Sequence, residues 1–511
     1  MARDGTQYLL PDGLGVEGAS ELLAAHFDVE SERPRATDRR FYDTFDGRLH
    51  SAELVLTHEG GRLVLSDAAG YKRASADRPV PPRTLFASEL PHGPLRELLE
   101  PIVKVRALTP IARVRSRLRL LRVLDDQAKT VVRLAVEEPS LAGAGQHPRL
   151  GPRARVIPVR GYDKALTQVR LRLERELGLT EAGTSLQDEA VAAGGGVPGG
   201  ISSKLDVRGL RPSERADRGT ATALAGPLAA ITANLPGTLA DVDSEFLHDL
   251  RVAVRRTRSL QRQLGSVFPP EPLAHFRGEF KWLQQVTGTV RDLDVHLIEI
   301  AAYREALSVD DLDPLGAVLA ARRRTEFRRM ARALRSKRTS ELLVGWEGLV
   351  EDLPTAPEEN RPDAGAQIAD VAGARIRSVY RRMVKMGRRI DSESPPEALH
   401  DLRKKGKELR YLLEFFAGIY PSEVVKPMVR RLKVLQDALG RYQDREVQAG
   451  MLRSLRHEVG ALDGGAAALM AMGLVVDGLE HDQAVARDEF AGRFAPFAAK
   501  KQRWLVDETF G

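Results

Sequence analysis

One motif in this sequence occurs twice, and the repeat constrains how the C-terminal half can fold. His248-Asp-Leu-Arg251 recurs as His400-Asp-Leu-Arg403, at an offset of 152 residues. The same offset continues without a gap and matches Lys281 with Lys433, Leu283 with Leu435, Gln284 with Gln436, Gly288 with Gly440 and Asp292 with Asp444. Chance can supply one four-residue match, but two matching clusters in one register indicate an internal duplication.

The residues that follow position 218 have the apolar spacing of amphipathic helices, with a period of 3.6 residues. Ala, Leu and Arg are abundant there, which also favours helix. Pro or Gly interrupts the pattern at many joints, and the predicted helices cover 221–240, 245–264, 271–305, 314–336, 366–390, 397–417, 421–456 and 465–492. We therefore expect eight helices in two sets of four, from copies at about 219–340 and 366–495.

A glycine-rich stretch at 192–200 separates this half from a different kind of sequence. So many glycines cannot sustain a helix or a strand, so we expect a linker over 191–218. Short segments with β-branched or alternating residues precede it, at 53–56, 62–65, 111–120 and 130–136, together with a helical pattern at 166–177. The sequence thus predicts a multidomain α+β protein, with a mixed domain over 1–190 and an all-α domain over 219–505.

The composition limits the chemistry and the setting. The chain has no cysteine, which excludes disulfides, thiolate metal sites and a Cys nucleophile. No apolar signal segment is visible, and the longest nearly apolar run, 465–476, is shorter than the roughly 20 residues that cross a bilayer. We therefore expect a cytoplasmic protein without a membrane partner. Its 78 basic residues face 71 acidic ones, so local clusters matter more than the net charge.

A row of basic residues heads the first copy of the repeat. His248, Arg251, Arg255 and Arg258 are spaced by three, four and three residues, so they share one face of a helix. No acidic residue lies between Arg251 and Arg262, which extends the row. Like charges at this spacing destabilise a helix by roughly a few tenths of a kcal/mol per pair. A row that occurs twice therefore indicates an anionic ligand that relieves the repulsion.

The second copy repeats this face, and neighbouring helices add to it. Arg binds phosphate in a bidentate manner, Lys acts as a compact charge, and a nearby phosphate favours the cationic form of His. We expect a phosphate-rich polyanion to contact His248, Arg251, Arg255, Arg258, Arg262, Lys281, His400, Arg403, Lys404, Lys407, Arg410 and Lys433. A solvated helix face is the alternative, and the in-register duplication favours binding. For the arginine runs at 322–335 and 375–389, which lack this pairing, both interpretations stay open.

Two other patterns set bounds on the chemistry. The series Gln284, Gly288 and Asp292 favours a structural role, because Gly permits close helix approach while Gln and Asp bond backbone or orient an Arg. The His-Asp pair is similar to that of metal-dependent phosphohydrolases, which need further His and Asp ligands. Neither copy has metal-binding spacing, so we expect no metal site, no cofactor and no catalytic residue there.

These residues support a family resemblance for the region from about 219 to 505. H-D-L-R-V-A-V-R-R-T-R, H-D-L-R-K-K-G-K-E-L-R and the two L-Q-x-x-x-G-x-x-x-D segments resemble the CHAD family, the conserved histidine α-helical domain. The resemblance implies two four-helix bundles related by a pseudo-twofold axis around a basic groove or pore. It also implies binding of inorganic polyphosphate, often with association to polyphosphate granules.

The N-terminal half resembles the CYTH superfamily of triphosphate tunnel proteins, on Phe41-Tyr-Asp-Thr44 followed by Leu49. The resemblance implies an antiparallel, barrel-like β-tunnel. A predicted strand carries four alternating arginines: Arg113, Arg115, Arg117 and Arg119. Alternate residues of a strand point to the same face. This face either lines the tunnel or lies exposed on an edge strand. The family's Glu-x-Glu-x-Lys metal motif is absent, and the adjacent Glu137 and Glu138 point to opposite faces. We therefore expect a degenerate domain without metal catalysis.

Together these patterns predict a protein that binds inorganic polyphosphate and is located in the cytoplasm, at polyphosphate granules. One alternative is an enzyme whose N-terminal domain hydrolyses triphosphate or polyphosphate and is recruited by the helical domain. A nucleic-acid binder is a weaker alternative, because the basic rows lack the interleaved aromatic residues that stack on bases. A helical scaffold for an acidic protein stays open as well.

Overall fold

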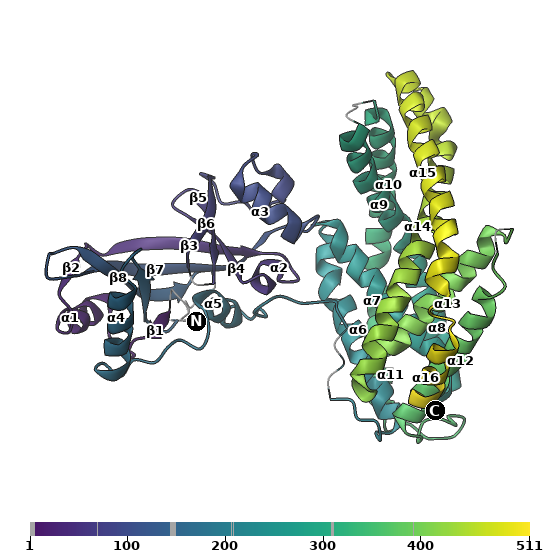
Figure 1. Cartoon of the computed structure of the whole chain (residues 1–511), viewed down its shortest axis with the longest axis horizontal. Helices are drawn as coiled ribbons and strands as arrows, with labels where there is room; N and C mark the ends of the chain where they lie inside the picture. Colours follow the sequence, from purple (N-terminus) through teal and green to yellow (C-terminus); the bar gives the residue numbers. More distant parts are fainter. Residues whose placement is uncertain are drawn as a thin grey trace. The chain divides into compact units, whose positions relative to one another are not determined.

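The structure is a computed structural model and describes residues 6–68, 70–143, 150–205, 207, 209–307, 311–391 and 393–511. The chain forms two compact units, Met1–Ser202 and Ser203–Gly511 (Figure 1). The division falls inside the expected linker, of which residues 206 and 208 lie outside the described part. Two helices reach into the edges of that interval, α5 (Leu186–Ala193) and α6 (Ala216–Leu239).

The first unit is built on one antiparallel sheet that curls into a half-barrel (Figure 1). The strand order is β1-β9-β8-β7-β3-β4-β5-β6, and β2 pairs with β7. The predicted antiparallel β-architecture is thereby confirmed. The strands are β1 (Gln7–Leu9), β2 (Val29–Ser31), β3 (Arg35–Asp43), β4 (Leu54–Glu59), β5 (Arg62–Asp67), β6 (Lys72–Asp77), β7 (Thr109–Leu124), β8 (Thr130–Leu141) and β9 (Arg153–Pro158).

Helices cover one face of this sheet. Apolar residues of α1 (Val16–Ala24) and α4 (Asp163–Arg175) pack on β7, β8 and β9, and α3 (Pro94–Val103) packs on β4, β5 and β6. Strand pairing places these contacts on the outer face, because side chains alternate along each strand. The inner, concave face is closed at one end by α5, which contacts Val114 and Phe41. The short helix α2 (Arg48–Ser51) follows β3.

The second unit is all-helical, as predicted, and its elements follow the repeat. Each start in the first copy lies 152 residues before its counterpart: α6 at 216 and α12 at 368, α7 at 244 and α13 at 396, α8 at 270 and α14 at 422, α10 at 313 and α15 at 465. The remaining bounds are α7 (Ser244–Gln263), α8 (Pro270–Val286), α9 (Gly288–Leu307), α10 (Asp313–Leu334), α11 (Lys337–Asp352), α12 (Ile368–Gly387), α13 (Pro396–Phe415), α14 (Ser422–Gly460), α15 (Gly465–Phe494) and α16 (Lys500–Thr509).

The expectation of eight helices needs two corrections. The short helices α11 and α16 follow the fourth segment of each copy and were not predicted. The helix expected at 271–305 is divided into α8 and α9, which meet at Thr287. There the Arg251 guanidinium donates to the carbonyl of Gln284 at 2.8 Å and to the Thr287 hydroxyl at 3.0 Å. The side chain thus occupies the acceptor that a continuous helix would offer to Gly288. The second copy has Leu439 in place of Thr287, and α14 continues through it.

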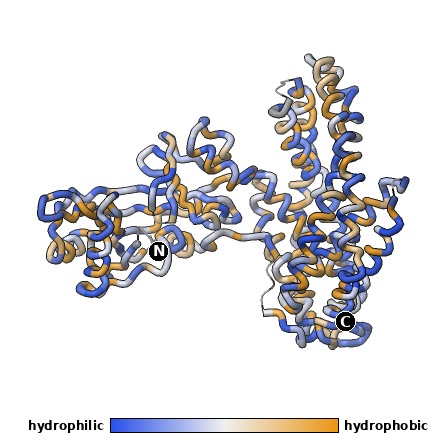
Figure 2. Tube along the Cα trace, in the orientation of Figure 1, coloured by the Kyte–Doolittle hydropathy of each residue, from blue (hydrophilic) through white to orange (hydrophobic). Residues whose placement is uncertain are grey.

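One hydrophobic core runs through both copies, and it includes the fully buried Trp346 packed among Phe268, Phe276 and Phe280. A second apolar cluster joins α9, α10, α15 and the C-terminal half of α14. Figure 2 shows hydrophobic and hydrophilic residues alternating along the helices, as the periodicity predicts. In the described ranges, every helix is too short or too polar to span a membrane.

Candidate functional site

Helices α7 and α13 carry the two basic rows, and each is anchored by its apolar face. Asp243 caps α7 by accepting from the backbone amides of Glu245 at 2.9 Å and Phe246 at 3.2 Å. Pro395 and Pro396 begin α13, where the fixed backbone angle of proline suits a first turn. The opposite face of α7 enters the core through Leu247, Leu250, Ala253, Val254 and Leu260, and that of α13 through Leu399, Leu402, Leu409 and Leu412. Burial of these faces orients the two rows.

The two helices contact each other in antiparallel directions. Arg256 lies 3.8 Å from Glu414, and Arg262 lies 3.4 Å from Glu408, so the sequence rises along one helix while it falls along the other. The pairs are related by the repeat, since Arg256 corresponds to Glu408 and Arg262 to Glu414 at the offset of 152. A pseudo-twofold axis therefore passes between α7 and α13. Positions that are arginine in the first copy are glutamate in the second, which makes both contacts attractive.

Arg255 and Lys407 are equivalent to each other in the repeat, and each lies about one turn from the axis, which the two contact pairs place level with Ser259 and Tyr411. Both side chains are half-buried, and neither forms an ion pair within the part of the chain that the structure describes. The Nε of Arg255 is buried without a hydrogen-bond acceptor. Burial, Arg403 and Arg255 together lower the pKa of Lys407 to about 8. Positive charge from both copies is thus concentrated around Lys407, and Asp444 offsets it only in part.

Arg251 and Arg403 are also equivalent, but they have different partners. Burial, followed by repulsion from Arg255, lowers the pKa of Arg251 to about 10, and its guanidinium is held at the α8–α9 junction. Arg403 lies 3.1 Å from the exposed Asp444. Gly288 and Gly440 lie beneath these guanidinium groups, and a Cβ there would be 3.6 Å and 3.5 Å from them, which is ordinary contact. The glycines therefore face arginines and do not mark the close helix approach that we expected.

Arg258 and Arg410 flank the same face. Arg258 donates to the side-chain oxygen of Gln284, which shows that this glutamine orients an arginine of the row. Burial lowers the pKa of Arg258, and the neighbouring Arg262 lowers it further. Arg410 lies 3.6 Å from Glu414 and 5.6 Å from the centre of the Tyr411 ring.

The two histidines begin the rows in the second turns of α7 and α13, and both are half-buried. His400 forms a hydrogen bond with the side-chain oxygen of Gln443 through Nδ1. Burial and the nearby Lys404 lower the pKa of His400, so the ring is neutral at pH 7 in the ligand-free protein. The expected histidine cation would therefore have to be induced by a ligand.

Four of the predicted binding residues lie at the edge of the basic face formed by α7 and α13. Arg262 is mostly exposed beyond its contact with Glu408, and Lys404 is exposed and lies 3.1 Å from Asp401. Lys281 on α8 and Lys433 on α14 are exposed. Among the described residues, neither lysine has an ion pair or hydrogen bond with the α7–α13 residues.

In the first unit, the four alternating arginines were expected either to line a tunnel or to lie exposed on an edge strand. Arg113, Arg115, Arg117 and Arg119 share one face of β7 as expected, but it is the outer face. Asp38 pairs with Arg113 and lies 3.5 Å from Arg115. Glu17 of α1 pairs with Arg117 and lies 3.6 Å from Arg119. Acidic residues from β3 and α1 thus neutralise this row, which the sequence of β7 alone does not reveal.

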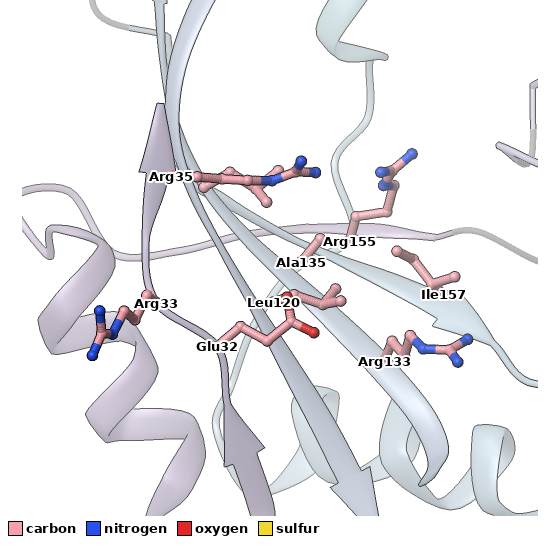
Figure 3. A pocket seen from close by; sticks show the side chains of 9 residues that line it. Glu32, Arg33, Arg35, Leu120, Arg133, Ala135, Arg155 and Ile157 are labelled. Carbon is pink, nitrogen blue, oxygen red and sulfur yellow. The ribbon is translucent and has the colours of Figure 1, made fainter. Parts of the chain in front are cut away.

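A cavity of about 210 Å³ lies on the opposite, concave face (Figure 3). Figure 3 shows Arg35 and Arg155 extending into the same space, with Arg133 below them and Arg33 pointing away. None of these arginines has an ion pair among the described residues. The remaining wall consists of Glu32, Leu118, Leu120, Ala135 and Ile157. These positions come from separate strands and share a face only through the pairing register, so sequence reasoning missed them.

A polar network lies beside the cavity. Arg39 is 3.2 Å from Glu59 and 3.4 Å from Glu137, which accepts a hydrogen bond from Ser116 at 2.5 Å. Burial and Arg39 lower the pKa of Arg155. Glu137 is therefore on the concave face, while the next residue in the strand points outward. Within the described ranges, no group of three or more His, Asp and Glu side chains is arranged to hold a metal ion.

Comparisons with known proteins identify the helical unit. Residues 222–453 match the CHAD domain family, so this part of the chain is a CHAD domain, as its resemblance to that family predicted. The crystal structure of the CHAD domain from the plant Ricinus communis is 24% identical, covers 58% of this chain and 96% of that chain, and has a TM-score of 0.50, which shows the fold alone. PptA from Streptomyces chartreusis is 17% identical, covers 55% of this chain and 99% of that chain, and has a TM-score of 0.41.

Two curated relatives match a smaller part of the chain. Both are uncharacterized proteins of Mycobacterium tuberculosis, from the CDC 1551 and H37Rv strains, and each is 31% identical over 212 residues. The match covers 39% of this chain and 38% of each relative, so it spans about two-fifths of their length. For the N-terminal unit, the structure shows an antiparallel half-barrel, and its CYTH resemblance stays a prediction.

Proposed function

We propose that this protein binds inorganic polyphosphate through the basic face formed by α7 and α13. The observation that carries the proposal is the proximity of Arg255 and Lys407, equivalent cations of α7 and α13 that have no ion pair among the described residues. Such an arrangement is unfavourable in isolation, and a chain of phosphates would relieve it. The CHAD family is associated with polyphosphate binding, which supports the same ligand.

The face suits a flexible polyanion better than a single phosphate. Its cations lie on two antiparallel helices, so consecutive phosphates of one chain can bridge both copies of the repeat. Several weak contacts on one chain reinforce one another, because each contact after the first is intramolecular. Binding releases counterions, so the affinity is expected to fall steeply with salt. Arginines supply bidentate contacts, while Lys407 supplies a point charge at the centre.

Glu408 and Glu414 pair with some of the basic residues and so limit which of them are available to bind phosphate. Glu408 is buried and contacts Lys405 at 2.6 Å as well as Arg262 at 3.4 Å. Glu414 lies near Arg256 and Arg410. The two glutamates link α7 to α13 and leave Arg255 and Lys407, which have no ion pair among the described residues, for a ligand. By this binding, the protein would associate with polyphosphate granules in the cytoplasm.

Polyphosphate binding by the full chain tests the proposal. The double variant Arg255→Gln and Lys407→Gln is expected to lower the affinity at least tenfold, roughly the effect of losing two charge-assisted contacts. Arg381 and Arg441 are exposed arginines that already pair with Asp507 and Glu489. Changing both to Gln removes the same charge away from the axis and is expected to leave the affinity within about twofold. Equal losses in both variants would mean that only net charge matters.

A second candidate function concerns the first unit, where the concave cavity presents Arg35, Arg133 and Arg155 without ion-pair partners among the described residues. This arrangement favours binding of a small phosphorylated anion and keeps open the alternative of a hydrolase recruited by the CHAD domain. Incubation with tripolyphosphate and Mg²⁺ or Mn²⁺, followed by a phosphate assay, separates binding from hydrolysis. Turnover that disappears in Arg155→Gln would establish the enzyme. Displacement of long polyphosphate by DNA at equal phosphate concentration would instead favour nucleic-acid binding.

A further inference from the structure

One helix of the CHAD domain carries arginines of two kinds. On α10, Arg322 pairs with Glu458, Arg323 with Asp241 and Asp294, and Arg329 with Glu326. Three others are exposed and have no acidic partner in the part of the chain that the structure describes: Arg324, Arg328 and Arg332. Within that part, the Arg328 guanidinium donates a hydrogen bond to the Arg324 carbonyl at 3.3 Å. We call these three residues the α10 row.

The members of the α10 row are four residues apart and therefore lie along one flank of the helix, over about 12 Å. Their repulsion destabilises the helix by roughly a few tenths of a kcal/mol per pair. The C-terminal helix dipole favours a cation at Arg332, but Arg324 lies in the middle of α10 and gains nothing from it. A solvated helix face therefore leaves the row without a stabilising interaction.

The α10 row belongs to one copy of the repeat only. Its members correspond, at the offset of 152, to Val476, Glu480 and Ala484 on α15. The basic rows of α7 and α13, which we together call the central face, lie on both sides of the pseudo-twofold axis. The α10 row extends the positive surface on the side of the first copy only. Duplication has been followed here by divergence in charge.

The row lies next to the end of α7 that carries His248. Arg323, the neighbour of Arg324, binds Asp241 at 2.6 Å, two residues before the cap of α7. Arg335, one turn beyond Arg332, donates to the carbonyl of Leu239 at 3.2 Å. The α6–α7 turn therefore packs against α10. A polyphosphate chain that extends from the central face beyond His248 would come close to the α10 row.

We propose that the α10 row is a second contact track for long polyphosphate, so that a chain held at the central face continues over the first copy of the repeat. The proposal rests on the proposed function. It adds the path that the bound polyphosphate follows, from the central face toward α10, and a preference for long chains. Within the helical unit, a short polyphosphate can occupy the central face only, whereas a long chain gains additional contacts at high local concentration. Long-chain binding should therefore depend on residues that short-chain binding does not use.

The test compares tripolyphosphate with long-chain polyphosphate on the full-length protein. The triple variant Arg324→Gln, Arg328→Gln and Arg332→Gln keeps good helix formers in α10. We expect its long-chain affinity to fall at least about tenfold, and the slope of log affinity against log salt to decrease by about 2, since each lost phosphate contact removes about 0.7. Tripolyphosphate affinity should be unchanged. Circular dichroism and the melting temperature check that the variant is folded.

The matched control removes three paired, exposed arginines of the second copy, through Arg381→Gln, Arg441→Gln and Arg453→Gln. It changes the net charge equally, and retention of its long-chain affinity supports the track. Equal losses in both triple variants would overturn it, as would a wild-type protein that binds both ligands equally well. A row variant that weakens DNA binding but not polyphosphate binding would also overturn it. Failure of the wild type to bind either polyphosphate would overturn the proposed function itself.

Discussion

Arg255 and Lys407 occupy the same position in the two copies of the repeat, and they lie close enough that Arg255 helps to lower the pKa of Lys407. Both copies have kept a cation at this position, although two cations repel. The neighbouring positions have diverged instead, so that Arg256 meets Glu414 and Arg262 meets Glu408. The domain thus combines attractive contacts between α7 and α13 with neighbouring cations that have no ion pair among the described residues.

The first prediction concerns the stability of the ligand-free protein. The pKa of Lys407 is lowered from 10.5 to about 8, so the unfolded chain binds more protons than the folded one between these values. The charged Lys407 therefore destabilises the fold fully below pH 8, and the penalty disappears as the pH rises toward 10.5. Lys407→Gln should be more stable than the wild type at pH 7, with the difference shrinking at high pH. Urea denaturation across this range measures it, and a less stable variant at pH 7 would contradict the prediction.

The second prediction concerns the pH dependence of binding. Polyphosphate favours the protonated form of Lys407, so the affinity should fall as the pH rises through 8, by at most about tenfold per pH unit. Lys407→Arg keeps its charge over this range and serves as the control, with an affinity that changes much less. Isothermal titration at constant ionic strength distinguishes the two profiles. Parallel curves for both proteins would exclude a role for this lysine.

The third prediction concerns the acidic side of the α7–α13 contact. Glu408→Gln leaves Lys405 without its buried partner, so we expect a loss of about 1–3 kcal/mol in the free energy of unfolding. The same change releases Arg262, which should raise polyphosphate affinity slightly. Glu359→Gln, at an exposed position outside the helices, is the control and should change neither quantity. A fully stable Glu408→Gln protein would show that the contact does not hold the copies together.

The fourth prediction separates two equivalent arginines. Arg251 donates to a carbonyl at the α8–α9 junction, whereas Arg403 pairs with the exposed Asp444. Arg251→Ala should therefore destabilise the protein by about 1–3 kcal/mol, and Arg403→Ala by less than about 1 kcal/mol. Chemical denaturation measures both. If the two losses are equal, the junction does not depend on the Arg251 guanidinium.

The fifth prediction concerns the concave cavity of the first unit. In a background with Arg255→Gln and Lys407→Gln, which weakens the helical site, tripolyphosphate should still raise the melting temperature through the cavity. Arg155→Gln should abolish this shift. Arg115→Gln, on the outer face beside Asp38, should retain it. Loss of the shift in Arg115→Gln alone would restore the original expectation that the β7 row binds the anion.

Local pattern predicted most of the architecture of the helical unit, though not the short helices α11 and α16. The offset of 152 residues is a property of the sequence itself, and helix starts in the two copies differ by that number because equal local sequence makes equal local structure. The 3.6-residue period likewise predicted which side chains share a face. It did not predict the break at Thr287, because that break depends on Arg251, which reaches it from another helix.

Only the tertiary structure decided which basic residues are neutralised. The four alternating arginines of β7 and the row of α7 are equally basic in sequence. Asp38 and Glu17 reach the former from other elements, whereas Arg255 has no ion pair among the described residues and lies near the cationic Lys407. Likewise, Arg35 and Arg155 come together through strand pairing across the sheet. The face of a helix or strand on which a residue lies can be predicted from the sequence, because local backbone geometry fixes the repeat of each element. What that face meets depends on contacts between residues far apart in the chain, and these are formed only by packing.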